Sequence, residues 1–124
     1  MKTIKELEKF VEENVSTISG NYYVCDYKNI VKADDYEDAV SKVSRNSEDI
    51  VRSVEELKGM LISDYPKLVR YEVSARFAEE NQKKYFYIIC KDEQEVRSLC
   101  KWLQKETGAI IGNICEYGQY QMIL

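Results

Sequence analysis

The side chains best suited to chemistry in this sequence are carboxylates, tyrosines and cysteines, because the chain contains no histidine. The absence of histidine excludes Ser–His and Cys–His nucleophile pairs and every histidine-ligated metal site. The five glycines form neither a dinucleotide-binding fingerprint nor a phosphate-binding loop, and no nucleophile elbow occurs. We therefore expect a protein that is not an enzyme, with no catalytic residue, no cofactor and no metal.

A group of carboxylates in the first half of the chain has two interpretations. Asp34, Asp35, Glu37 and Asp38 are spaced as in a capping box, whose acidic side chains bind free amides at a helix start. Together with Asp26 they are also the best candidates for a Mg²⁺ site, since Mg²⁺ needs only one or two carboxylates beside substrate phosphates. Capping is the simpler explanation.

Asp26 also carries a resemblance to a known family. In the segment Tyr23-Val-Cys-Asp26-Tyr27 it follows a predicted strand, and in this one residue the chain resembles the Cas2 family of small ferredoxin-like nucleases. The resemblance implies a carboxylate- and Mg²⁺-dependent nuclease as one alternative function.

A second set of residues combines aromatic and basic side chains. The segment 83–90 resembles the eight-residue signature of RNA-recognition-motif domains, which it matches at Lys83, Tyr85, Tyr87 and Ile88. Those domains stack bases on aromatic side chains of two central strands, so the resemblance implies single-stranded nucleic acid as an alternative ligand. The plainer interpretation is that the tyrosines fill the core. The residues that would bind nucleic acid are Tyr23, Arg70, Arg76, Lys83, Lys84, Tyr85 and Tyr87.

The charge distribution favours a protein partner over nucleic acid. The net charge is −4, and residues 1–64 hold 14 acidic and 9 basic side chains against 8 and 9 in residues 65–124. An acidic surface steers encounter with a basic partner. The chain has ten tyrosines, a residue type that supplies interface area at low entropy cost, and Trp102 is a candidate anchor off the apolar stripe of its predicted helix.

The expected function is therefore that of a small non-enzymatic protein-binding protein, an inhibitor or regulator. Its partner would be a basic, nucleic-acid-handling protein. By general analogy, phage-encoded inhibitors of the anti-CRISPR type block basic nucleic-acid channels in this way. The residues expected to bind the partner are Asp34, Asp35, Glu37, Asp38 and Trp102.

The cysteines indicate a reducing compartment. No C-x-x-C pair occurs, and each cysteine lies in an apolar pattern, so we expect four buried, reduced thiols. The charged first segment and the short apolar runs lead us to expect no signal peptide, no membrane-spanning segment, and a cytoplasmic protein without membrane contact. The four residues are Cys25, Cys90, Cys100 and Cys115.

Three capping boxes mark the helices that must position these residues. The first box begins at Thr3 and predicts a helix over 4–18 that Gly20 ends. The second, Asp34-Asp-Tyr-Glu37, opens a helical pattern over 35–63, as one helix or two. The third begins at Asp92 and predicts a helix that ends at Gly108.

The remaining apolar segments predict strands. Residues 22–31 alternate, residues 68–77 are apolar on one face only as in an edge strand, and residues 85–90 are apolar on both faces as in a central strand. Residues 109–115 form another apolar strand. A turn at 116–119 and a short strand at 120–124 complete the chain.

This order of elements predicts an α+β fold in a single domain over 1–124. Residues 1–20 carry the N-terminal helix, 21–115 a βαββαβ core, and 116–124 the final turn and strand. The core pattern is that of ferredoxin-like domains, with both long helices on one face of an antiparallel sheet. Analogy with that fold implies the strand order 4-1-3-2.

Overall fold

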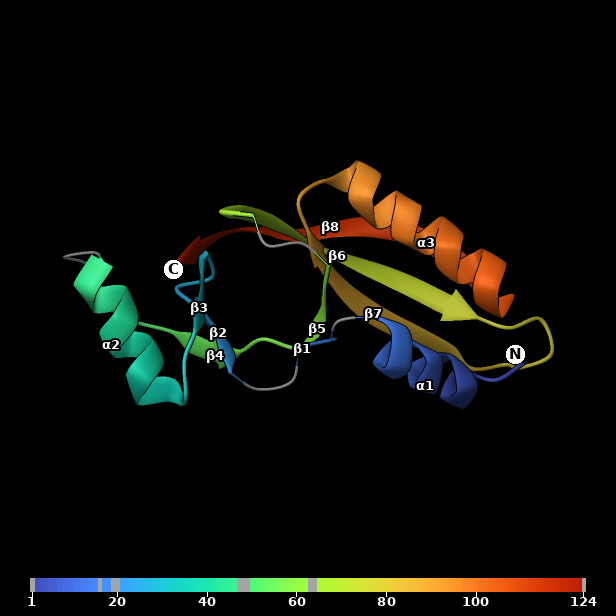
Figure 1. Ribbon diagram of the computed structural model, residues 1–124, viewed down its shortest axis with the longest axis horizontal. Coiled ribbons are helices and arrows are strands. Elements are labelled where there is room, and N and C mark those ends of the chain that lie inside the picture. The colour runs from blue at the N-terminus through green and yellow to red at the C-terminus, as the bar shows by residue number, and fades with distance from the viewer. Residues whose placement is uncertain (1, 16, 19–20, 47–49, 63–64, 124) are drawn as a thin grey trace.

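The computed structural model describes residues 2–15, 17–18, 21–46, 50–62 and 65–123. The described part of the chain contains both helices and strands, and this mixture confirms the predicted α+β class (Figure 1). In order, the elements are α1 (Ile4–Asn14), β1 (Thr17–Ile18), β2 (Tyr22–Cys25), β3 (Asn29–Lys32), α2 (Tyr36–Asn46), β4 (Val54–Glu56), β5 (Gly59–Leu61), β6 (Lys67–Arg76), β7 (Lys83–Cys90), α3 (Glu93–Thr107) and β8 (Ile110–Ile123).

The described strands form one 8-stranded sheet in the order β1-β5-β7-β6-β8-β3-β2-β4. Strand β6 is antiparallel to both β7 and β8, whereas β5 is parallel to β7 and β3 is parallel to β8. The ferredoxin-like topology is not confirmed, because both the number and the order of the strands differ from it. In particular, β6 lies at the centre of the sheet, and the prediction of an edge strand at 68–77 is wrong.

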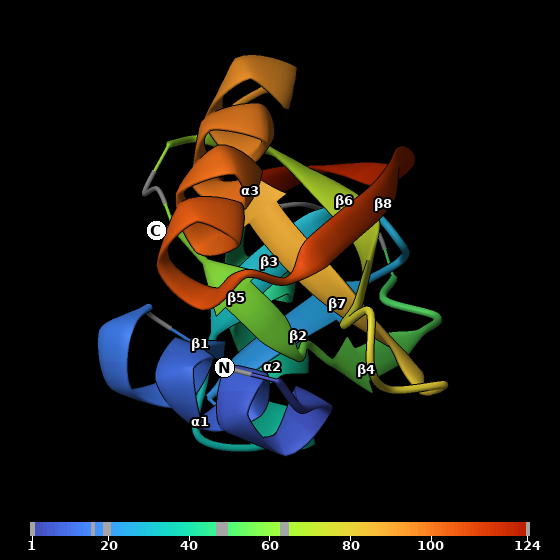
Figure 2. The same ribbon diagram turned by 90° about the vertical axis from the view of Figure 1, so that its right-hand side faces the viewer.

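Helices α1 and α3 cover the same face of the central strands (Figure 2). Leu7 and Val11 of α1 pack in one apolar cluster with Val96 of α3 and with Val73 and Ile88 of the sheet. Helix α2 lies at the other end of the molecule, where it packs on β2 and β3 (Figure 1). The two helices on one face are therefore α1 and α3, and not the two long helices of the predicted ferredoxin-like core.

The helix starts follow the predicted local chemistry. The Thr3 hydroxyl accepts a hydrogen bond from the Glu6 amide at 3.2 Å, and the Asp92 carboxylate accepts one from the Glu95 amide at 3.0 Å. Gly108 ends α3 in the left-handed conformation with φ 77°, as predicted. Helix α1 ends earlier than predicted, at an extended Val15; Gly20 lies outside the described residues.

The predicted first strand, 22–31, is a hairpin of two strands. Asp26 and Tyr27 adopt positive φ angles of 52° and 61°, which reverses the chain between β2 and β3. Alternation of apolar residues on both sides of this turn made the segment look continuous.

The helical pattern predicted over 35–63 holds only to residue 46, where α2 ends. Residues 47–49 lie outside the described part, and the chain then forms β4, which pairs with β2, and β5, which pairs with β7. Gly59 has φ 141°, and a Cβ there would lie 2.7 Å from the Tyr87 carbonyl oxygen. Pairing with strands that are distant in the sequence therefore determines the structure of this segment, although its local periodicity favours a helix.

The last strand also corrects a prediction. Strand β8 runs through residues 116–119, where a turn was expected, and it pairs with β6 along its length. The pairing register between β6 and β8 shifts between Arg70 and Tyr71 and again between Val73 and Ala75. Such shifts mark β-bulges, in which one strand carries an extra residue and still continues.

Candidate functional site

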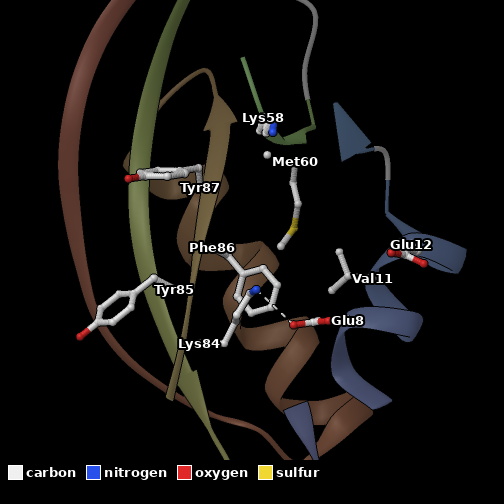
Figure 3. Close-up of a pocket in the computed structure, with 10 residues that line it drawn as sticks. Glu8, Val11, Glu12, Lys58, Met60, Lys84, Tyr85, Phe86 and Tyr87 are labelled. Carbon is white, nitrogen blue, oxygen red and sulfur yellow. Dashed lines mark ion pairs between the residues drawn. The ribbon is translucent and has the colours of Figure 1, made fainter. Parts of the chain in front are cut away.

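The side of β6–β7–β8 opposite α1 and α3, from Arg70 to Arg76 along β6, is here named the open face. Directly paired residues share a face, and Arg76 pairs with Lys83, Ser74 with Tyr85, and Glu72 with Tyr87. Figure 3 shows the Tyr85 and Tyr87 side chains pointing away from α1. The structure thus brings together most of the predicted aromatic and basic set on one sheet face.

Arg70 is surrounded by tyrosine rings on this face. Its guanidinium carbon lies 5.0 Å from the ring centre of Tyr87, 4.7 Å from that of Tyr117 and 5.3 Å from that of Tyr120. The Arg70 Nε is buried and has no hydrogen-bond partner among the described residues. Attraction between the cation and the electron-rich ring faces therefore stabilises this side chain.

Two tyrosines of the open face remain accessible. Tyr85 is 55% exposed and Tyr117 is 56% exposed, whereas Tyr120 is buried and Tyr87 half-buried. The rings of Tyr87 and Tyr117 meet edge to face at 5.3 Å. Burial, and then the hydrogen bond with Tyr117, raise the pKa of the Tyr87 phenol. Sequence reasoning missed Tyr117 because it assigned that residue to a turn.

Two members of the predicted nucleic-acid set do not reach the open face. Lys84 projects to the α1 side, where its ammonium pairs with the Glu8 carboxylate at 3.2 Å (Figure 3). Tyr23 is only 7% exposed, and its ring packs against that of Tyr36 at 5.0 Å. Neither residue can contribute to a surface on β6–β7–β8.

The acidic group at the start of α2 serves as a helix cap. The Asp35 carboxylate accepts a hydrogen bond from the Asp38 amide at 2.7 Å, and the Asp38 carboxylate accepts one from the Asp34 amide at 2.9 Å. Asp38 also pairs with Lys42 at 3.2 Å. Capping is therefore confirmed, but the box begins at Asp35 and not, as predicted, at Asp34.

The tertiary structure adds a carboxylate to this acidic group. Burial, and then the nearby Glu56 carboxylate, raise the pKa of Tyr23. Tyr36, which packs on Tyr23, is 51% exposed, and Asp34 and Glu37 are exposed as well. The α2 end of the molecule thus combines an accessible aromatic ring with several carboxylates.

The Asp26 side chain is held by backbone hydrogen bonds from another segment of the chain. Its carboxylate accepts hydrogen bonds from the amides of Arg52, at 2.8 Å, and Ser53, at 3.0 Å, and these bonds lower its pKa. Asp26 thereby ties the β2–β3 turn to the segment before β4. Within the described ranges no group of three His, Cys, Asp or Glu side chains is arranged to hold a metal ion.

Comparison with protein-family models, with curated proteins and with solved structures found no match to this chain. Inference about function therefore depends on the geometry of the surfaces themselves. No helix in the described part of the chain combines the length and apolar character required to cross a lipid bilayer.

Two further predicted features have clear positions. Trp102 packs its ring 5.4 Å from that of Phe10, which joins α3 to α1, and it remains 37% exposed. Three cysteines are buried thiols, but Cys115 is exposed, and the prediction of burial is wrong for it. All four cysteines are free: Cys25, Cys90, Cys100 and Cys115.

Proposed function

We propose that this chain is a non-enzymatic protein-binding protein whose recognition surface is the open face. The observation that supports this proposal is the cluster of Arg70 with Tyr87, Tyr117 and Tyr120, beside the exposed ring of Tyr85. Tyrosine and arginine are among the residue types most enriched where interface binding energy is concentrated.

The cluster is also ordered before any partner arrives. Contacts with Arg70 and with each other restrict the rings of Tyr87 and Tyr117. Side chains that are already fixed lose little conformational entropy on binding, and tyrosine has few rotatable bonds to begin with. An interface centred here therefore retains more of its contact energy as affinity.

The charge of the chain favours a partner with a basic region. The net charge is −4. Burial, and then the nearby carboxylates of Glu56, Asp35 and Asp34, raise the pKa of Tyr23, and the exposed ring of Tyr36 packs on Tyr23 at the α2 end. Such a surface accelerates encounter with a positively charged protein and slows encounter with a polyanion. A protein of this kind acts as an inhibitor or regulator by occupying the surface of a nucleic-acid-handling partner, as anti-CRISPR-like proteins do.

One observation favours a second function, binding of single-stranded nucleic acid. Arg76 and Lys83 pair across β6 and β7 on the open face, and the Lys83 ammonium lies 5.9 Å from the ring centre of Tyr85. Bases stack on exposed aromatic rings while basic side chains contact the phosphates, with about 1–3 kcal/mol per stacked base. The two functions would use the same tyrosines, and they differ in whether the ligand is a protein or a single-stranded nucleic acid.

The experiment titrates one labelled protein against two ligands at two salt concentrations. The first ligand is the protein recovered by affinity purification from the native source, and the second is a single-stranded oligonucleotide. We expect Tyr85→Ala with Tyr117→Ala to weaken binding of the protein ligand by at least about a hundredfold, the loss typical of two interface anchors. Tyr27→Ala, which removes a 75% exposed ring outside the open face, is the matched control.

Charge reversal tests the steering role separately. Asp34→Lys with Glu37→Lys leaves the capping carboxylates of Asp35 and Asp38 intact, and it is expected to slow association with a basic partner and reduce its salt dependence. Oligonucleotide binding that depends on Tyr85 and Tyr117, without any protein ligand that depends on them, would overturn the proposal in favour of the second function.

A further inference from the structure

Strand β7 has a free edge in its first half. On one side it pairs with β6 along its whole length, from Lys83 to Cys90. On the other side β5 pairs only with Ile88 and Ile89. No strand in the described part of the chain pairs with residues 83–87 on that side.

The backbone direction shows which groups this edge presents. The Ile62 amide donates a hydrogen bond to the Ile89 carbonyl at 3.1 Å, so the polar groups of Ile89 face β5. Alternate residues of a strand present their N–H and C=O groups to the same side, so those of Tyr85 and Tyr87 also point to the β5 side, and those of Tyr85 lie beyond the end of β5. The close approach of Gly59 to the Tyr87 carbonyl oxygen agrees with this direction.

A groove of about 400 Å³ runs between this edge and α1 (Figure 3). Apolar side chains of three different elements line it: Val11 of α1, Met60 of β5 and Phe86 of β7. The Lys84–Glu8 ion pair crosses it, and Figure 3 shows both side chains directed across the space between α1 and β7. The groove therefore combines an unpaired strand edge with an apolar wall.

We propose that an extended segment of a partner protein binds in this groove as an additional strand, hydrogen-bonded to the β7 edge at Tyr85. Strand addition of this kind draws its affinity from main-chain hydrogen bonds and its specificity from alternate side chains. The site shares Tyr85 and Lys83 with the open face. It uses the backbone of Tyr85 and not the Tyr85 ring, so the inference does not depend on the function proposed above.

The side chains of the site determine the chemistry of the segment. Residues of the added strand that point toward α1 meet Val11, Met60 and Phe86, so they are apolar. Residues that point the other way meet Lys83, and Lys58 lies at the end of the groove. Lys84 is already neutralised by Glu8, whereas no ion pair within 4 Å is found for Lys58 or Lys83 among the described residues. The fitting segment alternates apolar and acidic residues.

The same charges argue against a second copy of this chain as the occupant. Lysines on an edge strand are a common protection against edge-to-edge pairing. Pairing of two β7 edges would bring the Lys83 side chains of both copies close together, and no ion pair is found for Lys83 among the described residues. An acidic extended segment relieves this repulsion.

The test uses a short peptide of alternating valine and glutamate, with a valine–lysine peptide as the charge control. We expect the acidic peptide to bind at least about tenfold more tightly and to slow amide hydrogen exchange at Tyr85. A version of the acidic peptide methylated at alternate backbone nitrogens is expected not to bind, because it lacks the donors that pair with β7.

A protein variant gives an independent arm. Tyr85→Pro removes an amide that faces the free edge, and proline is tolerated at such edge positions. We expect it to abolish peptide binding, whereas Tyr85→Ala, which keeps the amide, is expected to retain it. If the proline variant does not fold, the comparison of normal and methylated peptides on the unmodified protein decides the matter.

Three results would overturn the inference. They are equal affinity for the acidic and lysine peptides, unchanged exchange at Tyr85 on peptide binding, and dimerisation in sedimentation experiments that slows exchange at the same amide without any peptide.

Discussion

The guanidinium carbon of Arg70 lies 4.7 Å from the ring centre of Tyr117, although the two residues belong to different strands. The bulge in β8 explains this contact. Arg70 pairs with Gly118 and Tyr71 with Glu116, so Tyr117 is the extra residue between two pairs. Bulges redirect a side chain relative to regular pleating, and here the bulge turns the Tyr117 ring toward Arg70.

This relationship predicts energetic coupling between the two side chains. Arg70→Met, Tyr117→Ala and the double variant are expected to show a coupling free energy of about 0.5–2 kcal/mol, since a partly buried cation loses its ring partner. Urea unfolding measures it. The cycle of Arg76→Met with Tyr117→Ala is the control and is expected to be additive. Additivity in the Arg70 cycle as well would contradict a stabilising contact.

The capping geometry of α2 predicts unequal roles for neighbouring carboxylates. Asp35 accepts a hydrogen bond from the Asp38 amide, and Asp35→Ala is expected to lower the free energy of unfolding by about 1 kcal/mol. Glu37→Ala removes an exposed side chain of the first turn, and we expect a change within about 0.5 kcal/mol. Thermal unfolding followed by circular dichroism distinguishes them. Equal losses would show that Asp35 acts only through its charge.

Asp26 predicts a defined pH dependence of stability. Hydrogen bonds from the Arg52 and Ser53 amides hold its pKa below the ordinary value of 3.8 in the folded state. The stabilisation is therefore complete above about pH 4 and is lost as the pH falls through the lower folded pKa. Asp26→Asn is expected to be less stable than the unmodified protein at pH 7, and the difference in melting temperature should shrink below pH 4. A constant difference at all pH values would refute this account.

The thiols predict selective labelling. Burial raises the pKa of Cys90 to about 12 and that of Cys100 to about 11, so neither forms thiolate near neutral pH, and Cys25 is buried as well. We expect iodoacetamide to label only exposed Cys115 in the native protein at pH 8. Mass spectrometry after unfolding without reductant should show four labelled thiols. Two missing labels would reveal a disulfide.

Local chemistry allowed the sequence to determine the starts of α1 and α3 and the end of α3. The carboxylate of Asp92 and the left-handed Gly108 act within one turn of their own helix, so their types and spacing predicted α3 from the sequence. The same is true of Thr3 and the start of α1. The hairpin of β6 and β7 was also predictable, because residues 68–77 alternate, residues 85–90 are apolar on both faces, and only a short polar connection separates the two strands.

Segments whose partners lie far away in the chain could not be assigned from local pattern. Residues 50–61 fit a helical stripe, but residues 54–56 pair with the edge of β2 and residues 59–61 lie along β7 as strands. The position of β6 was likewise set by β8, which pairs with it along an entire side. Strand order depends on pairing energies between segments separated by dozens of residues. The hydrophobic periodicity of one segment does not indicate which other segment it pairs with.

The residues of the candidate site also fall into those that the sequence predicted and those that only the tertiary structure brought together. The sequence by itself identified Tyr85 and Tyr87 as neighbours on one strand face, because alternation along a strand is local. Only the tertiary structure placed Tyr23 in the core, brought Arg70 among rings from two other strands, and exposed Tyr117. The physical reason is that a sheet face is assembled from several strands, so which side chains meet on it is decided by strand order and by a bulge, and not by the residues alone.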